Sequence, residues 1–397
     1  MRTPLRARVI GAGPTGSLAA LVLAQAGWRV QLLDPLDAHQ LKQRSRSYAL
    51  NHSSQELLQQ SQLWETLLPD LAPFSRLELW DRALPKQVRF SLADLGRERA
   101  ERPGEAVGWV LLHRPLMAAL LERLAAHPEV ELALGPEAGA SPLTSSFDPN
   151  GDPSIDLTVV ADGSGSATRE RLGIRHTSIP YSQGCLSVQV RLRGSAPDQA
   201  WELFRPEGPF AVLPLGDDHV QLVWSAPTAR LRQLESLDPV ALLEAIAAVL
   251  PDQLEPDALL NQPQAYPVAL ELAHRLHRGQ ALLVGETAHR CHPVGGQGLN
   301  LCWRDVAELR RQALRVARGR LAVERIGPAY AWRRWGDLLI TLLATDLLLR
   351  LFSNRWGPLL VVRRVALSAL KHWAPLRALS LGVMTFGPCR GLRAWSK

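Results

Sequence analysis

The segment from residue 8 to residue 34 constrains the fold of this chain more than any other. It contains, in order, an apolar run at 8–10, a glycine-rich turn at 11–16, an Ala/Leu-rich stretch at 17–26 and a second apolar run at 28–33. Strand, turn, helix and strand within about 27 residues is the size and order of a dinucleotide-binding unit. The sequence therefore predicts a βαβ unit at its start.

The glycine turn carries the chemistry of this unit. It reads Gly11-Ala-Gly13-Pro14-Thr15-Gly16, which fits G-x-G-x-x-G between a strand and a helix. Gly11 allows the tight turn, Gly13 lets backbone N–H groups approach a pyrophosphate, and Gly16 lets helix and strand pack closely. Asp34, 23 positions after Gly11, is placed to accept hydrogen bonds from an adenosine ribose. This motif alone does not distinguish NAD from FAD.

The composition is that of a folded protein whose C-terminal quarter is strongly basic. Hydrophobic residues make up 46% and charged residues 21% of the 397 residues, which excludes a disordered chain. Residues 304–397 hold 18 Lys/Arg against 5 Asp/Glu, leaving 27 against 33 elsewhere. Because this basic segment is interleaved with Leu/Val runs and has no nucleic-acid motif, it favours an anionic membrane surface over nucleic acid.

Two further glycine motifs follow strand-like runs. The second is Val159-Val-Ala-Asp162-Gly163-Ser-Gly-Ser-Ala-Thr-Arg169, and the third is Gly285-Glu286-Thr-Ala-His289-Arg-Cys-His292-Pro293-Val-Gly295-Gly296-Gln297-Gly298-Leu299-Asn300. Taken in order, the three motifs resemble the FAD-dependent aromatic hydroxylases with the p-hydroxybenzoate hydroxylase fold. The nearest likeness is to the ubiquinone-pathway hydroxylases of 2-polyprenylphenols. The likeness also includes the stretch 46–51, which begins at Arg46, and the stretch 109–114, which ends at Arg114. We expect both arginines to bind the cofactor.

The resemblance implies an α/β fold with a three-layer, Rossmann-like FAD-binding lobe, an inserted sheet-rich substrate lobe and a C-terminal helical tail. The expected FAD-binding domain comprises residues 1–75, 106–180 and 269–330. Residues 76–105 and 181–268 would form the substrate domain, and 331–397 the helical, basic and apolar tail. Residues 48–68 alternate at helical spacing, so we also expect a helix there.

The resemblance also implies residue roles. Asp162 and Gly163 would contact FAD, and the acidic position at Glu286, after Gly285, would bind the ribityl chain. The family usually has Asp at that position. The loop Pro293, Gly295, Gly296 would face the pyrimidine edge of the flavin, with Gly298, Leu299 and Asn300 at the start of the next helix. That helix start would stabilise negative charge on the reduced flavin.

These roles imply an FAD-dependent monooxygenase that hydroxylates the ring of a prenylated phenol in quinone biosynthesis. NAD(P)H would be the electron donor and O2 the co-substrate, acting through a flavin C4a-hydroperoxide. The alternatives are a flavin-dependent reductase of a prenyl chain and a non-catalytic FAD-binding subunit of a membrane assembly. No residue spacing identifies a catalytic base. His289 and His292 have no further ligand at metal-binding spacing, so no metal site is expected.

Two hypotheses remain for the role of the C-terminal tail. Leu-rich runs with basic and Trp residues in 332–381 suit peripheral contact with a membrane or with quinone-pathway enzymes, and they equally suit a helical cover for the FAD lobe. The apolar run 338–352 is too short to span a bilayer.

The start of the chain and its cysteines predict a location. A strand lies within the first ten residues, and the four cysteines have neither C-x-x-C nor metal-ligand spacing. We therefore expect a cytoplasmic protein, with the inner face of a membrane as its site of attachment.

Overall fold

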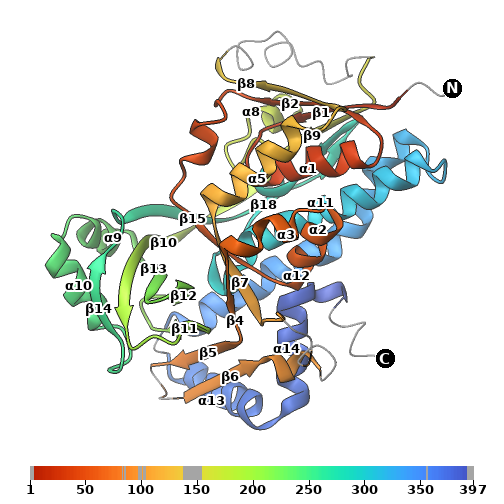
Figure 1. Cartoon of the computed structure of the whole chain (residues 1–397). Coiled ribbons are helices and arrows are strands. Elements are labelled where there is room, and N and C mark those ends of the chain that lie inside the picture. The colour runs from red at the N-terminus through yellow and green to blue at the C-terminus, as the bar shows by residue number, and fades with distance from the viewer. Residues whose placement is uncertain are drawn as a thin grey trace.

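The computed structural model describes residues 4–82, 84, 86–96, 101, 104–136, 154–354 and 356–390. Parts of the predicted domains, chiefly 137–153 and 391–397, lie outside these residues. Figure 1 shows a helix-rich lobe that holds both the N-terminal strands and α11, beside a second lobe built on a large sheet. The α/β fold predicted from the glycine motifs is confirmed.

The first lobe is built on a six-stranded sheet in the order β16-β17-β9-β1-β2-β8. The strands β1 (Arg6–Ile10), β2 (Arg29–Asp34), β8 (Val130–Leu134), β9 (Leu157–Val160) and β17 (Ala281–Leu283) run parallel, and β16 (His277–Arg278) is antiparallel at the edge. Helix α1 (Pro14–Gln25) packs on this sheet, with α5 (His113–Ala125) and α11 (Gln297–Ala317) beside it. The predicted βαβ unit is therefore present as β1, α1 and β2.

The second lobe is a nine-stranded sheet in the order β18-β15-β10-β13-β12-β11-β5-β6, with β14 paired to β10. Its strands are β5 (Arg76–Asp81), β6 (Lys86–Ser91), β10 (His176–Arg193), β11 (Gln199–Phe204), β12 (Phe210–Gly216), β13 (His219–Pro227), β14 (Glu255–Leu259), β15 (Gln264–Ala273) and β18 (His289–Arg290). Helices α9 (Thr228–Glu235) and α10 (Pro239–Ala247) cover one face around Trp224. Strand β10 runs through the domain boundary predicted at residue 181, and β15 runs through the one predicted at 269. Because each strand belongs to both predicted domains, the strands do not decide where one domain ends, and the boundaries stay a prediction.

A small sheet replaces part of an expected helix. Residues 47–50 form β3 (Ser47–Leu50), which pairs with β7 (Gly108–Leu112), and β7 pairs with β4 (Leu71–Phe74). Only α2 (His52–Gln60) and the short α3 (Trp64–Leu67) are helical, separated by a turn in which Gln62 has φ 57°. The expectation of a helix over 48–68 is wrong at both points, because strand pairing and this turn override the local periodicity.

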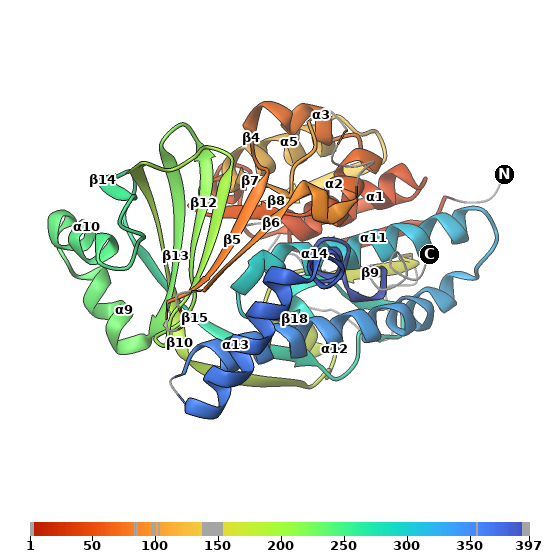
Figure 2. The same cartoon turned by 90° about the horizontal axis from the view of Figure 1, so that it is seen from below.

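Three helices form the C-terminal tail: α12 (Ile326–Phe352), α13 (Gly357–His372) and α14 (Ala374–Phe386). Helix α13 contacts β6, and α14 contacts η3 (Leu92–Leu95), which directly follows β6 (Figure 2). Arg363 of α13 and Asp81 of β5 form a fully buried ion pair, with Nε and Oδ2 3.0 Å apart. In the described part of the chain, no helix is both long enough and apolar enough to cross a membrane.

Short segments complete the described chain: η1 (Gln40–Lys42), η2 (Leu68–Asp70), η3 (Leu92–Leu95), α8 (Ala167–Arg171), η4 (Gly285–Thr287), η5 (Val294–Gly296) and η6 (Val323–Arg325). One apolar core fills the first lobe and a second lies under α9 and α10. A third lies between the large sheet, the small sheet and the tail, and it includes Val294, Phe204, Phe352 and Leu381. This third core is where the two lobes and the tail meet.

Candidate active site at the carboxyl edge of the parallel sheet

The three glycine motifs lie at one edge of the parallel sheet. Gly11 follows β1, Asp162 follows β9, Gly285 follows β17, and Asp34 ends β2. These four strands are neighbours in the sheet and run in the same direction. Their carboxyl ends therefore meet, at the place where open parallel sheets bind their ligands.

The motifs also contact one another. A Cβ on Gly11, where φ is +99°, would lie 2.4 Å from the Ala161 carbonyl oxygen, so only glycine fits there. Thr287 Oγ1 lies 3.3 Å from an oxygen of Asp162 and accepts from the Gly163 N–H at 3.2 Å. Buried Arg169 donates to the Thr287 carbonyl at 2.9 Å. The first motif meets the second, and the second meets the third, through these short contacts.

The first turn of α1 fits a dinucleotide pyrophosphate. Gly13, Pro14 and Thr15 are partly exposed, and a Cβ on Gly13 would meet no atom within 4 Å, so open space lies before the helix. The N–H groups in that first turn have no partners within the helix and carry its positive dipole end. Gly16, in contrast, is buried, and its Cβ would lie 1.8 Å from the Gly11 carbonyl oxygen.

Asp34 and the two arginines occupy the predicted neighbourhood. Asp34 accepts from the Ala12 N–H at 2.7 Å and from the Leu36 N–H at 2.8 Å, and each of its oxygens retains a further lone pair. Pairing of β3 with β7 brings Arg46 and Arg114 to the same end of the small sheet. Both side chains are exposed, and Arg46 also lies 5.7 Å from the Tyr266 ring centroid.

A buried ion network holds the third motif. Asp305 of α11 accepts from the Gly285 N–H at 2.8 Å and from His289 Nε2 at 2.7 Å, and it pairs with Arg334 of α12 at 2.6 Å. Burial alone would raise the pKa of Asp305, but the charges of His289 and Arg334 lower it to about 2. His289 therefore orients the turn that carries Gly285 and the exposed Glu286. Among the described residues, no cluster of three or more His, Cys, Asp or Glu side chains could hold a metal.

The residues 293–298, which we call the glycine loop, end on the N-terminus of α11. Gly295 and Gly296 have φ of +67° and +63°, a left-handed backbone that only glycine adopts without strain. Pro293, Gly295, Gly296, Gly298 and Leu299 are all partly exposed. The loop therefore presents backbone, with little side chain, to the outside of the helix start.

Asn300 fastens this loop from behind. Its Oδ1 accepts from the Asn51 N–H at 3.0 Å and from Ser54 Oγ at 2.6 Å, and its Nδ2 donates to the carbonyls of Ala49 and Gly296 at 2.7 Å each. Because both ends of the amide are occupied by protein, a direct contact of this side chain with a cofactor would replace one of these bonds. The geometry makes Asn300 a support of the loop.

The structure places Glu202 of β11 opposite the loop. Its side chain is 8% exposed, and the nearby Gly295 N–H favours the charged form of its carboxylate. Burial raises the pKa of this carboxyl to about 7, against the smaller lowering effect of that N–H. The sequence analysis did not identify Glu202. The available signal was an acidic residue between Ala200 and Phe204, on the inward side of an alternating strand.

His292, directly before the loop, is a second buried titratable group. The side chain is 0% exposed, its Nδ1 accepts from the Val294 N–H at 3.2 Å, and its ring stands edge-on to Tyr181 with centroids 5.6 Å apart. Burial lowers the pKa of His292 to about 4, so the imidazole is neutral near pH 7. With Nδ1 accepting, the proton is on Nε2, which has no partner in the described chain.

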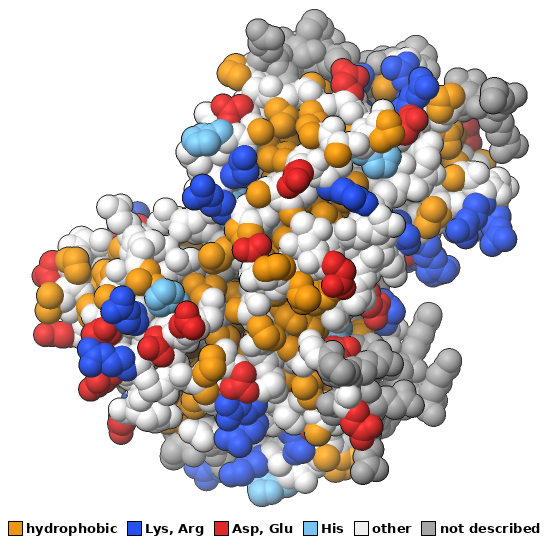
Figure 3. Space-filling view, viewed as in Figure 1, with side chains coloured by type: hydrophobic (Ala, Val, Ile, Leu, Met, Phe, Trp, Pro, Cys, Tyr) orange, Lys and Arg blue, Asp and Glu red, His pale blue; other side chains and the backbone are white. Residues whose placement is uncertain are grey.

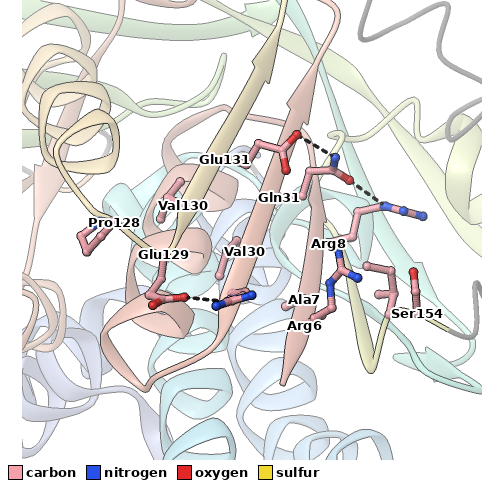
Figure 4. A pocket seen from close by; sticks show the side chains of 12 residues that line it. Arg6, Ala7, Arg8, Val30, Gln31, Pro128, Glu129, Val130, Glu131 and Ser154 are labelled. Carbon is pink, nitrogen blue, oxygen red and sulfur yellow. Dashed lines mark hydrogen bonds and ion pairs between the residues drawn. The ribbon is translucent and has the colours of Figure 1, made fainter. Parts of the chain in front are cut away.

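A separate cavity of about 520 Å³ lies toward the opposite ends of β1, β2 and β8. Figure 4 shows that its lining side chains pair with one another, Arg8 with Gln31, Gln31 with Glu131 and Arg29 with Glu129. It contains none of the motif residues. We therefore assign the chemistry to the carboxyl edge and the glycine loop, and none to this cavity.

Comparison with known proteins agrees with this site. The family model described as FAD binding domain matches residues 5–122 and 146–334. The chain is 30% identical to the 3-demethoxyubiquinol 3-hydroxylase of Escherichia coli, covering 95% of this chain and 97% of that protein. It is also 30% identical to a ubiquinone hydroxylase of Rhodospirillum rubrum, covering 96% and 90%.

A solved structure shows the same fold. The p-nitrophenol 4-monooxygenase of Pseudomonas putida superposes with a TM-score of 0.74 at 18% identity, over 98% of this chain and 99% of that one. At this identity the likeness concerns the fold alone. It extends through both lobes and the tail.

Proposed function

Because the chain belongs to the FAD-binding domain family, in its branch of ubiquinone-pathway hydroxylases, it is an FAD-dependent monooxygenase, and we propose that it hydroxylates the ring of a prenylated phenol in quinone biosynthesis. The observation that supports this most is the 30% identity to two ubiquinone hydroxylases over nearly the whole of each chain, together with the three motifs gathered at one sheet edge. The substrate class is thus proposed from relatives whose chains match from end to end.

Specific residues would hold FAD. The first turn of α1 at Gly13 would bind the pyrophosphate, and Asp34 the adenosine ribose, with Arg46 and Arg114 flanking the cofactor. Asp162, Gly163 and Glu286 would contact its central part. The open space at Gly13, Gly163 and Gly298, where a Cβ would meet no atom within 4 Å, supports this path. FAD held by these residues would supply the electrons that activate O2, with NAD(P)H as the proposed source.

The glycine loop would stabilise the reduced cofactor. Backbone N–H groups at the start of α11 would present partial positive charge where negative charge develops on reduction. Asn300 and the Asp305 network hold that backbone in place before the cofactor arrives. Pre-organised donors of this kind lose no energy to rearrangement during the reaction.

The phenol ring would lie between the glycine loop and the large sheet. The sheet face on that side carries partly exposed apolar residues, Leu77, Leu79, Leu213 and Leu215, that pack against the third core. An apolar enclosure suits a prenyl tail and excludes bulk water, which limits unproductive release of hydrogen peroxide.

The prenyl tail leads to a second part of the proposal, docking on an anionic lipid bilayer. Of fifteen large hydrophobic side chains exposed in the described chain, eleven lie between residues 332 and 373. They are Trp332, Leu339, Ile340, Leu343, Leu347, Leu348, Trp356, Val361, Val362, Val365 and Trp373, which we call the tail patch. The α12 members recur at helical spacing on one side of that helix.

Charge supports a lipid partner for the tail patch. Arg333, Arg350, Arg364 and Lys371 are exposed on the same helices, and Figure 3 shows basic side chains gathered where β6 and α13 lie. Apolar side chains with interfacial Trp and nearby cations are the features of helices that lie in a membrane surface. A water-insoluble substrate could then enter from the bilayer without crossing water.

The experiment that tests the function uses purified FAD-loaded protein, NAD(P)H and 2-geranylphenol in 18O2. We expect a phenol with one added 18O atom and oxygen consumption that depends on the phenol. A product with a reduced prenyl chain and no 18O would identify a reductase. Consumption of NAD(P)H unaffected by the phenol, with no product, would exclude this substrate class.

A further inference from the structure

Glu202 is a buried carboxylate without a cationic partner among the described residues. It lies on β11 between Ala200 and Phe204, which are 0% and 4% exposed and belong to the third core. Burying a charged carboxylate in an apolar core is costly unless it is compensated. The nearby Gly295 N–H favours the charged form, which compensates only part of that cost. A functional reason for its position is therefore worth seeking.

Strand register fixes the side to which Glu202 points. It pairs with Leu79 of β5 and Ala211 of β12, whose side chains share its face of the sheet. Trp201 and Leu203, its chain neighbours, point to the opposite side and pack in the core under α9 and α10. Glu202 thus faces the glycine loop, among the partly exposed apolar residues that would enclose a phenol.

The charged groups around Glu202 leave it free to exchange a proton. Cys185 of β10 is close enough to interact with it, and burial raises the pKa of that thiol to about 12, so the thiol is neutral. Asp81, further along β5 on the same face, pairs with Arg363 of α13. Asp346 and Arg350 of α12 pair with each other near Tyr181. No cation in the described chain holds Glu202 permanently ionised.

We propose that Glu202 is the base that accepts the proton of the substrate's phenolic hydroxyl during hydroxylation. The O–H bond of the phenol breaks and an O–H bond forms on the carboxylate, leaving a phenolate whose electrons activate the ring toward oxygen. The ring carbon would gain a hydroxyl group, and on rearomatisation its hydrogen would leave as a proton to the oxygen that stays on the cofactor. Glu202 then returns its proton to the original oxygen. Because this role requires a phenolic substrate, it rests on the proposed function.

Geometry and proton affinity agree in this role. Burial raises the pKa of Glu202 to about 7, which matches a base that must both take and return a proton near neutral pH. An exposed carboxylate would be too weak a base, since its pKa is about 4. The carboxylate lies near the Gly295 N–H of the loop that would face the flavin, so the base and the reacting ring would share one enclosure.

The test compares wild-type holoenzyme with Glu202→Gln and Glu202→Asp, using 2-geranylphenol. Product formation is followed between pH 5 and 9, because a general base is detected by the pH dependence of turnover. We expect the wild-type rate to fall at low pH with an apparent pKa near 7, no such fall in Glu202→Gln, and a fall at lower pH in Glu202→Asp. Product formed per NAD(P)H oxidised should fall at least tenfold in Glu202→Gln, with FAD content unchanged.

The matched control is Glu78→Gln. Glu78 is equally buried at 2% exposure in the neighbouring strand, but it pairs with Trp201 and points to the other face, where Arg89 binds it. It should leave the pH profile and the product yield unchanged. The same pH profile and equal yield in Glu202→Gln and wild type would overturn the role of Glu202 alone. A wild type that neither binds nor hydroxylates the phenol would overturn the proposed function, and this role with it.

Discussion

The backbone carbonyl of Met384 in α14 accepts a hydrogen bond of 3.0 Å from the side-chain amide of Asn51, 333 positions earlier in the chain. Gln297, in the glycine loop, donates to the same carbonyl at 3.2 Å. The Asn51 N–H in turn donates to Asn300. The last helix of the tail is thereby hydrogen-bonded to the support of the glycine loop, so tail and loop should be stable together.

Asn51→Ala should loosen both. The substitution removes the bond to Met384 and the cap that Asn51 provides to α2 through the Ser54 N–H, at a cost of about 1–3 kcal/mol. Thermal unfolding and flavin fluorescence should report a lower melting temperature and earlier FAD release. Gln43→Ala, which removes an exposed amide bonded to His39, is the control and should change neither. An unchanged melting temperature in Asn51→Ala would refute the coupling.

Two alanine substitutions in the first glycine motif should have different effects, because one should prevent FAD binding and the other should prevent folding. Gly13→Ala adds a Cβ in open space, so the protein should fold, but the methyl group would occupy the proposed path of the pyrophosphate. Gly16→Ala places its Cβ 1.8 Å from a backbone oxygen, so the unit itself should be disrupted. We expect folded, colourless protein from the first and little soluble protein from the second. Absorbance at 450 nm per unit protein, with circular dichroism, measures both. Gly13→Ala with a full complement of FAD would contradict the assignment.

Asp305→Asn should strongly destabilise the protein. It removes the buried anion of His289 and one of the two that pair with Arg334, whose other partner is Asp337. Losing one partner of a buried pair costs about 3–5 kcal/mol. Because the pKa of Asp305 is lowered to about 2 in the folded state, its stabilisation is complete above pH 4 and is lost as the pH falls toward 2. Urea unfolding at pH 7 measures the loss. Glu129→Gln, which breaks an exposed pair with Arg29, should cost less than about 1 kcal/mol.

His292 should make stability depend on pH between about 6.5 and 4. Burial lowers its pKa to about 4 in the folded state, so the unfolded chain binds the proton first as the pH falls. Its contribution is fully present above pH 6.5 and decreases by about 3 kcal/mol as the pH falls to 4. His292→Phe removes the titration. The urea concentration at half-unfolding should decrease less between pH 7.5 and pH 5.0 in the variant than in the wild type. An equal decrease would refute the contribution of His292 to the pH dependence.

The tail patch should be required for binding to vesicles. Replacing Leu343, Leu347 and Val365 by Asn removes three of its most exposed apolar side chains. We expect at least a tenfold loss of flotation with vesicles containing anionic lipid, and weaker binding of the wild type in high salt. Replacing Leu68, Val240 and Leu260 by Asn is the control, because these residues are similarly exposed but lie outside the tail. Equal losses in both triple variants would overturn the docking proposal.

Local patterns were sufficient for much of the fold. The first βαβ unit and the helical tail follow from glycine spacing and apolar periodicity, which act over a few neighbouring residues. The helix expected over 48–68 was wrong, because pairing of β3 with β7 involves residues about sixty positions apart, and periodicity carries no record of it.

The sequence by itself determined the glycine motifs and, through them, the family and the cofactor, because turns that approach a phosphate restrict residue type position by position. Only the tertiary structure decided that Glu202 faces Gly295, that Asp305 holds His289 and Arg334, and that Met384 closes on Asn51. These contacts join separate elements, and strand register and burial set the side on which each group lies. The protonation and reactivity of a titratable group therefore depend on how these elements pack together.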